Sequence, residues 1–376
     1  MRPKTNLINN LCKIVKDYRS DENNGVGMVD NDRIEKWVNQ FDENDKLFIL
    51  EETNNLIKNR YLSRSEVEIK IIGALKTMAK DSTNISSFLS NSIFLDLQPP
   101  GKSQGVILEL LKSLIKEKLN FDIITSNLDE LNNNEGKHFI YFDDVLCTGN
   151  TYYQDIKDFL CLKDKRGQEY YKKILSRNIF LHQCFIFAHA VNWNKKINQL
   201  NMHVCEGINN ENFIGYCQED NIILQNDILR PVEEDQNQII TNYKNKINEQ
   251  VDRYSRSKNF TTNENYFRNA GFPGKEQFFS NSENRKRYEK ILLLKGIEIL
   301  DKSSASKPNI RAFGYSLPSV RNFGFGTICF TWRNVPNNTP LVFWYSIGGF
   351  TALFPKKVTG QTIKIMISDF EKSIKF

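Results

Sequence analysis

The segment 139–151 places the strongest constraint on what this chain can fold into. Its first four residues, Phe139 to Phe142, are apolar, which is typical of a short buried strand in a parallel sheet. Two adjacent acids, Asp143 and Asp144, come next, and we expect the strand to end at them. Thr148-Gly149-Asn150-Thr151 follows and leads into a helix-like stretch. The segment therefore predicts a strand, a glycine-containing turn and a helix.

The turn and the two acids together indicate a pocket for a ribose 5-phosphate. A glycine turn that leads into a helix presents backbone N–H groups and the positive end of the helix dipole to an anion. Carboxylates repel a phosphate, but they accept hydrogen bonds from sugar hydroxyls. The alternative is a strand–turn–helix with an Asp-rich turn and a Thr N-cap, which needs no ligand. We favour the pocket, because two adjacent acids at a buried strand are costly without partners.

This motif resembles the phosphoribosyl-pyrophosphate (PRPP) loop of type I phosphoribosyltransferases, in which an apolar strand and two acids precede Thr-Gly-x-Thr. The resemblance implies that Asp143 and Asp144 bind the ribose 2′ and 3′ hydroxyls. It implies that the 5′-phosphate is held by Thr148, Gly149, Asn150 and Thr151. It also implies Mg²⁺ as a cofactor, held through PRPP or a nucleotide rather than directly by the protein.

A second candidate anion loop, Gln98 to Gly105, precedes the first along the chain. Gly101 permits close approach of the backbone, Lys102 supplies positive charge, and Ser103 is placed to cap the next helix. By itself the segment is typical of a Pro-Gly turn with a Ser N-cap. Because it comes before the Asp143 strand, as the pyrophosphate loop of a PRPP enzyme does, we favour binding. The candidate catalytic residues are Asp143, Asp144 and Lys102.

Strands that alternate with helices predict an α/β fold, with a phosphoribosyltransferase-like parallel sheet flanked by helices. The expected strands are 93–97, 121–126, 139–142, 180–188 and 202–205, and the expected helices between them include 106–119 and 152–161. We expect an N-terminal helical region over 1–85, the α/β core over 86–230, and a C-terminal helical and β-rich extension over 231–376.

The extension contains two apolar runs, 327–332 and 341–344, which we expect to pair as a hairpin-like unit. Asn337 and Asn338 lie between them and could contact an acceptor, since each side chain offers donors and an acceptor. A turn held by Asx hydrogen bonds is the structural alternative, and we favour it. We interpret the charge run 283–290 as a solvated helix face.

Four further segments, each less specific than the PRPP-like loop, narrow the family resemblance: 37–41, 287–296, 335–344 and 353–356. Together with the PRPP-like loop they resemble a divergent branch, the phosphoribosyltransferase-like domain of bacterial conflict systems (PRTase-CE), over roughly residues 30 to 357. The resemblance implies an effector in anti-phage defence that is encoded beside partner proteins.

Composition restricts the setting of the protein. The chain of 376 residues has a formal net charge of +6, so nucleic-acid binding is possible but not demanded. Its seven cysteines are scattered without a Cys-x-x-Cys pair, and no metal-ligand spacing links them to the four histidines. No apolar stretch approaches the ~20 residues of a membrane span, and the N-terminus has no apolar signal core. We expect reduced thiols, a cytoplasmic location and no membrane partner.

Three functions stay open at this point. The leading hypothesis is chemistry at the anomeric carbon of a bound PRPP or nucleotide, by glycosyl transfer or N-glycosidic cleavage. No base-specificity loop is recognisable after Thr151, which argues against ordinary nucleotide salvage. The alternatives are a non-catalytic PRPP or nucleotide sensor, and a scaffold, either of which would regulate a partner protein or a nucleoprotein complex.

Overall fold

The computed structural model describes residues 3–20, 27–79, 84–131, 136–204, 213–219, 226–233, 237–256, 264–303, 308–346 and 349–356. The chain divides into two compact units, of which the first combines Met1–Arg64 with Asn221–Phe376 and the second is Ser65–Asp220. The boundary that the sequence suggested near residue 85 thus falls inside the second unit, and the extension shares a unit with the N-terminal helices. Whether the three expected parts fold separately stays a prediction.

The second unit holds the predicted parallel sheet. Its strands are β2 (Ser92–Leu95), β3 (Ile124–Ser126), β4 (His138–Leu146), β5 (Phe180–His189) and β6 (Phe213–Glu219). They lie in the order β3-β2-β4-β5-β6, and every neighbouring pair is parallel. The predicted α/β class with a parallel sheet is therefore confirmed.

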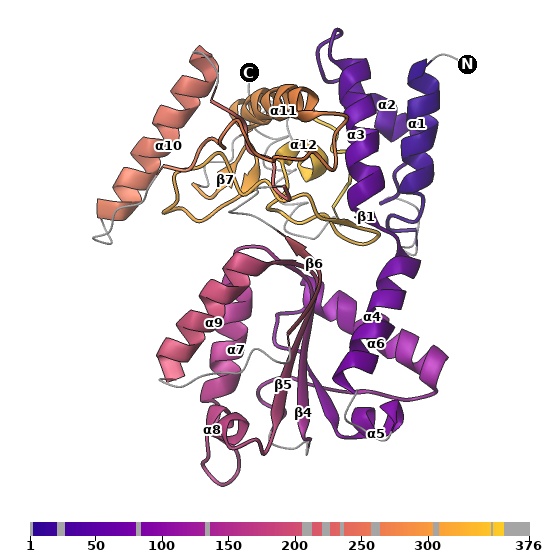
Figure 1. Ribbon diagram of the computed structural model, residues 1–376, viewed down its shortest axis with the longest axis vertical. Helices are drawn as coiled ribbons and strands as arrows, with labels where there is room; N and C mark the ends of the chain where they lie inside the picture. Colours follow the sequence, from indigo (N-terminus) through magenta and orange to yellow (C-terminus); the bar gives the residue numbers. More distant parts are fainter. Residues whose placement is uncertain are drawn as a thin grey trace, which may run out of the picture. The chain divides into compact units, whose positions relative to one another are not determined.

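Helices cover both faces of this sheet. They are α4 (Arg64–Met78), α5 (Ile85–Ser90), α6 (Ser103–Leu119), α7 (Asn150–Cys161), α8 (Tyr170–Leu175) and α9 (Ala190–Val204). Figure 1 shows α7, α8 and α9 on one face and α4, α5 and α6 on the other. On the α7 face, Phe139 and Tyr141 of β4 are buried in one cluster with Phe159 and Trp193. A sheet buried on both faces explains the nearly continuous apolar runs of β4 and β5.

The strand order creates a switch point between β2 and β4. From β2 the chain passes through α6 to β3 on one side of β2, and then returns to β4 on its other side. In such sheets ligands bind outside the carboxyl ends of the two strands at which the direction of winding reverses. Both loops singled out in the sequence begin at these two strand ends.

Two expectations for the sheet are wrong. β4 does not end before the acids but continues to Leu146, because β5 runs beside it and pairs Val145 with Phe187. Asp143 and Asp144 therefore lie within the strand. The strand expected at 202–205 is also wrong, because residues up to Val204 form the last turn of α9. The fifth strand of the sheet is instead β6, which the sequence did not reveal.

The first unit is mainly helical, with short strand pairs. Its elements are α1 (Pro3–Ile14), α2 (Asn31–Val38), α3 (Lys46–Arg60), β1 (Tyr61–Leu62), α10 (Gln238–Arg256), α11 (Ser282–Lys302), β7 (Ile310–Arg311), β8 (Gly314–Tyr315), β9 (Phe330–Thr331) and α12 (Leu341–Trp344). β1 pairs in parallel with β9, and β7 pairs antiparallel with β8. No helix of the described segments combines the length and the apolar character needed to cross a membrane.

The hairpin expected from 327–332 and 341–344 is wrong. Only Phe330 and Thr331 of the first run form a strand, and they pair with β1 near the other end of the chain. Leu341–Trp344 forms the short helix α12, in which the Tyr345 N–H donates to the Leu341 carbonyl at 2.8 Å. All four residues of α12 are buried, and a short, fully buried apolar run has no periodicity that separates a helix from a strand.

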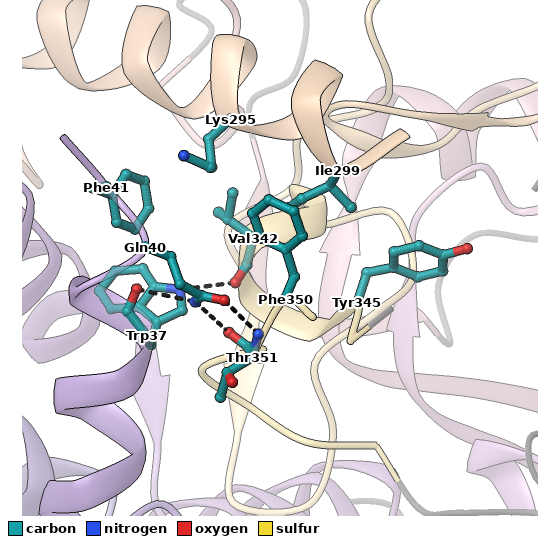
Figure 2. Close-up of a pocket in the computed structure, with 9 residues that line it drawn as sticks. All are labelled: Trp37, Gln40, Phe41, Lys295, Ile299, Val342, Tyr345, Phe350 and Thr351. Atoms are coloured by element: carbon teal, nitrogen blue, oxygen red, sulfur yellow. Dashed lines mark hydrogen bonds between the residues drawn. The ribbon is translucent and has the colours of Figure 1, made fainter. Parts of the chain in front are cut away.

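Segments from both ends of the chain meet in the first unit. The Trp37 indole N–H donates to the Val342 carbonyl at 2.9 Å, and the Gln40 side chain exchanges two hydrogen bonds with the backbone of Thr351. Figure 2 shows these contacts around a pocket large enough for about one water molecule, with Lys295 and Phe350 on its wall. The first unit thus contains all four segments that narrowed the family resemblance: 37–41, 287–296, 335–344 and 353–356.

The interpretation of 283–290 as a solvated helix face is wrong for two of its charges. Arg285 and Glu289 of α11 are fully buried, and Arg285 Nε donates to Glu289 Oε1 at 3.0 Å. Arg268, which is also buried, binds Glu289 Oε2 at 2.8 Å. The two charges pair with each other, and Arg268 and Glu276 from outside the run complete the buried cluster, so the charge run alone did not reveal their burial.

Candidate functional site

The side chain of Asp143 in β4 holds the loop after β2 and the start of α6. Ser103 Oγ donates to Asp143 Oδ1 at 2.9 Å, and Gln98 Nε2 donates to Asp143 Oδ2 at 2.8 Å. A third donor is the backbone N–H of Asp144, 2.8 Å from Oδ1. The structure therefore brings together Ser103 and Asp143, both predicted from the sequence, and adds Gln98 to the site.

A tight turn shapes the loop after β2. The Lys102 N–H donates to the Pro99 carbonyl at 3.3 Å, and Gly101 has φ +85° at the third position, which is typical of a type II turn. No atom lies within 4 Å of the position that a Cβ on Gly101 would take, so backbone conformation and not crowding favours glycine. Gln104 fixes the start of the loop, because its Oε1 accepts hydrogen bonds from the N–H groups of Leu97 and Gln98 at 2.8 and 3.0 Å.

The expected capping role of Ser103 is wrong. α6 begins at Ser103, and its N-cap residue is Lys102, which makes no side-chain capping hydrogen bond. The Ser103 hydroxyl is instead committed to Asp143. The Lys102 side chain is exposed at the start of α6, where its charge adds to the positive end of the helix dipole.

The loop after β4 ends in a left-handed glycine. Gly149 is the N-cap of α7 with φ +72°, and no side chain caps this helix end. Asn150 and Thr151 are exposed in the first helical turn, and Thr148 before them is half-buried. Since the first N–H groups of a helix have no partner within it, this end of α7 offers backbone donors and a positive dipole to an anion.

A chain of hydrogen bonds extends from Asp143 onto α7. Gln98 Nε2 also approaches the Tyr141 hydroxyl at 3.1 Å, and that hydroxyl donates to Asp155 Oδ2 at 2.9 Å. Burial raises the pKa of Asp155, against the opposing hydrogen bonds from Tyr141 and Gln98. The carboxylates of Asp143 and Asp155 are therefore linked through two neutral side chains, Gln98 and Tyr141.

Asp143 and Asp144 are not equivalent. Burial raises the pKa of Asp143 well above its ordinary value, and the charge of Asp144 raises it further, while the hydrogen bonds from Asp144 N–H, Gln98 and Ser103 act in the opposite direction. Asp144 is buried too, and because side chains alternate along a strand it points to the opposite face of β4. The role of both residues as partners of ribose hydroxyls stays a prediction.

Helix α9 contributes two residues that sequence reasoning missed. Asn192 Nδ2 donates to the Cys147 carbonyl at 2.7 Å, and Lys196 Nζ donates to Asn150 Oδ1 at 2.6 Å. Their spacing of i and i+4 puts both on one face of α9. That spacing is their only sequence signal, because nothing local connects α9 with the loop after β4. Gln98 lies inside the predicted loop 98–105 but was given no role of its own, and Tyr141 and Asp155 were missed because no local pattern links their side chains to that loop.

Asn337 and Asn338 lie in the first unit, whereas both loops lie in the second. The Asn337 carbonyl accepts from the Tyr315 N–H at 2.8 Å, and Asn338 Nδ2 donates to the Tyr315 carbonyl at 2.9 Å. Gly314 packs against this turn so closely that a Cβ would lie 2.4 Å from the Thr339 carbonyl oxygen. These contacts are those of a structural turn, and acceptor binding by the two asparagines stays a prediction.

A family model agrees with the resemblance seen in the sequence. The family model PRTase-CE matches residues 34–356. No curated protein matches the chain. A solved structure of HGPRT-ase from Leishmania tarentolae in complex with GMP is similar at 10% sequence identity and a TM-score of 0.24, over 35% of this chain and 72% of that one. Because the family model covers most of its length, the chain belongs to the PRTase-CE family.

Proposed function

We propose that this chain is a phosphoribosyltransferase-like effector that binds PRPP or a nucleotide and acts at the ribose anomeric carbon. The observation that carries the proposal is the pair of loops at the switch point, of which the first is hydrogen-bonded through Gln98 and Ser103 to Asp143 in the strand that leads to the second. A ribose with a phosphate at one end and a pyrophosphate at the other needs two anion sites with hydroxyl acceptors between them. Lys102 and the α7 N-terminus flank the acids in this way.

Each residue of the site has a role in the proposal. The 5′-phosphate binds Thr148, Gly149, Asn150 and Thr151 through backbone N–H groups and hydroxyls. Asp143 and Asp144 receive the ribose hydroxyls, and Lys102 with the Gly101 and Ser103 backbone holds the pyrophosphate.

Mg²⁺ fits this donor set when the ligand supplies most of its coordination. Among the described residues no group of three acidic, histidine or cysteine side chains is arranged to hold a metal. Mg²⁺ is usually bound by one or two carboxylates together with substrate phosphates. Asp143 and Asp144 lie in the C-terminal half of β4 and are the carboxylates that would contact the ion. The ion would neutralise charge on the pyrophosphate.

The proposed chemistry depends on position and charge. The bond from the anomeric carbon to the pyrophosphate oxygen breaks, its electron pair leaves with the pyrophosphate, and the acceptor forms the new bond. Positive charge builds on the sugar ring as the bond breaks, so nearby carboxylates stabilise the transition state. The loops hold both ends of the ribose, which removes much of the entropic cost of the reaction.

Calorimetric titration of the full chain with PRPP and Mg²⁺ tests the binding step. Absence of heat at millimolar ligand overturns both catalysis and sensing. Pyrophosphate or free-base release is then measured for the wild type and for Asp144→Asn. Release that falls in the variant supports catalysis, whereas equal release in the two proteins removes Asp144 from the mechanism.

A non-catalytic sensor is the second candidate, and one observation favours it. Three donors of the protein itself take three of the about four acceptor positions of the Asp143 carboxylate, so two ribose hydroxyls cannot both bind it without displacing Gln98 or Ser103. Such a displacement would move the loop after β2 and could signal to a partner. Binding without release of pyrophosphate or base, together with changed hydrogen exchange at 96–104, is the result that selects the sensor.

The biological setting is proposed from the family and not from the site. We propose that the protein works in the cytoplasm in anti-phage defence with partner proteins of its operon, and nucleic acid remains a possible partner. Phage infection of cells that carry the operon with wild-type protein or with Asp144→Asn tests this setting. Equal phage yield in the two strains and in cells without the operon overturns it.

A further inference from the structure

Lys196 brings a positive charge from α9 to the start of α7. Its Nζ lies 2.6 Å from Asn150 Oδ1 and 3.0 Å from Gln199 Oε1, and 5.4 Å from the centre of the Tyr153 ring. The aliphatic stem lies against the loop itself, because a Cβ built on Gly149 would be 2.8 Å from Lys196 Cγ. The side chain thus covers the left-handed glycine and ends beside the first helical turn.

The partners of this ammonium group are all neutral. Its hydrogen bonds go to two amide oxygens, and within the described ranges it makes no ion pair. Burial lowers the pKa of Lys196, and the nearby charge of Lys195 lowers it further. A half-buried cation beside the positive end of a helix is electrostatically unfavourable unless an anion is present.

We propose that Lys196 is a ligand-binding residue that pairs with the 5′-phosphate monoester of the bound ribose. The proposal rests on the proposed function, since it assigns a further residue to the same phosphate site. An ammonium group has three donors, and the two amide contacts leave one for a phosphate oxygen. The arrangement gives each end of the ligand its own lysine, with Lys102 at the pyrophosphate and Lys196 at the monoester.

If Lys196 binds the phosphate, Gly149 has two roles in the site. Gly149 supports the positive φ of the turn, and it also leaves room for the Lys196 stem. With any side chain at 149, the lysine would have to move away from the helix end. The close approach therefore links the residue type at 149 to the position of the charge at 196.

The test compares Lys196→Gln with Lys195→Gln, an exposed neighbour on the same helix that carries the same charge. Calorimetric titrations of the full chain use PRPP, ribose 5-phosphate and inorganic pyrophosphate, each with Mg²⁺. Loss of a charged hydrogen bond to the phosphate is expected to weaken PRPP and ribose 5-phosphate binding by about 10- to 100-fold. Pyrophosphate binding should change less than about threefold, and Lys195→Gln should behave like the wild type for all three ligands.

Salt and folding controls complete the experiment. The salt dependence of ribose 5-phosphate affinity should become shallower in Lys196→Gln, because one cation fewer contacts the phosphate. An unchanged or higher melting temperature without ligand shows that the variant folds. Equal ribose 5-phosphate affinity in wild type and Lys196→Gln overturns the assignment but leaves the proposed function standing. A wild type that binds neither PRPP nor ribose 5-phosphate overturns both.

Discussion

Gln98 Nε2 lies 2.8 Å from Asp143 Oδ2, so an amide of the loop after β2 contacts an oxygen to which we propose that a ribose hydroxyl binds. The same amide group contacts the Tyr141 hydroxyl at 3.1 Å. Gln98 therefore acts as a latch between the loop after β2 and strand β4. In the proposed complex, the ribose hydroxyls and Gln98 would compete for Asp143.

Gln98→Ala should tighten PRPP binding, because the ligand no longer displaces an internal hydrogen bond. A hydrogen bond of this kind contributes about 1 kcal/mol net, which corresponds to about fivefold in Kd. Titration of PRPP with Mg²⁺ into both proteins measures the change. Gln154→Ala, on the exposed side of α7, is the matched control. Weaker binding by Gln98→Ala would mean that Gln98 helps to hold the ligand instead of competing with it.

Asp143→Asn should stabilise the ligand-free protein while it weakens ligand binding. The folded-state pKa of Asp143 is raised above 3.8, so the charged form opposes folding. Wild-type stability should therefore fall as pH rises from 3.8 through the raised pKa, and the neutral variant should lack this fall. Urea unfolding between pH 4 and 8 measures the difference, expected at about 1 kcal/mol or more. Asp158→Asn, which changes an exposed acid of α7, should leave the profile unchanged.

Gly149→Ala and Gly101→Ala separate backbone strain from crowding. Both glycines have positive φ, which costs an alanine about 1–2 kcal/mol. A Cβ at 149 would also meet Lys196 Cγ at 2.8 Å, whereas a Cβ at 101 has open space. Thermal unfolding should thus show a larger loss for Gly149→Ala, and ribose 5-phosphate affinity should fall in that variant by more than in Gly101→Ala. Equal losses in both would contradict the close approach of Lys196.

The success of sequence reasoning depended on how local each feature was. The strand–turn–helix around Gly149 was predictable, because an apolar run and a Thr-Gly-x-Thr turn are local signals. The short apolar run at 341–344 was misassigned, since its burial on all sides removes any period. Gln98, Asp155 and Lys196 reach the site from three different elements, and only the winding of the sheet brings them together. Family resemblance identified the family but gave none of these contacts.

Acid should destabilise the second unit through a pair of histidines, of which His182 is buried and His138 is half-buried. His138 Nδ1 and His182 Nε2 lie 3.0 Å apart, and burial lowers the pKa of His138 and lowers that of His182 to about 3. The unfolded chain takes up protons near the ordinary value of 6.5, which the folded pair resists. The stabilisation is therefore complete above pH 6.5 and is lost as pH falls below it, by up to about 1.4 kcal/mol per pH unit for His182 and by less for the half-buried His138.

Unfolding by urea at pH 7.5 and 5.5 checks this loss. His182→Gln should show a smaller difference between the two pH values, because one buried titrating group is gone. His203→Gln provides the control, since His203 is exposed on α9. An acid-induced loss of the same size in His182→Gln and wild type would assign the pH dependence to other groups.

Glu289→Gln should strongly destabilise the first unit. Glu289 is fully buried and accepts hydrogen bonds from Arg285 Nε at 3.0 Å and from Arg268 Nη2 at 2.8 Å. The amide keeps the shape but leaves the two guanidinium groups with one fewer negative charge in a buried place. Removal of one partner from a buried ion pair costs about 3–5 kcal/mol, whereas loss of an exposed pair costs about 0–1 kcal/mol. Glu283→Gln, which removes the exposed partner of Lys286 on the same helix, is therefore the matched control. Thermal unfolding of the two variants should differ by several degrees or more, and equal melting temperatures would show that Glu289 does not stabilise the unit.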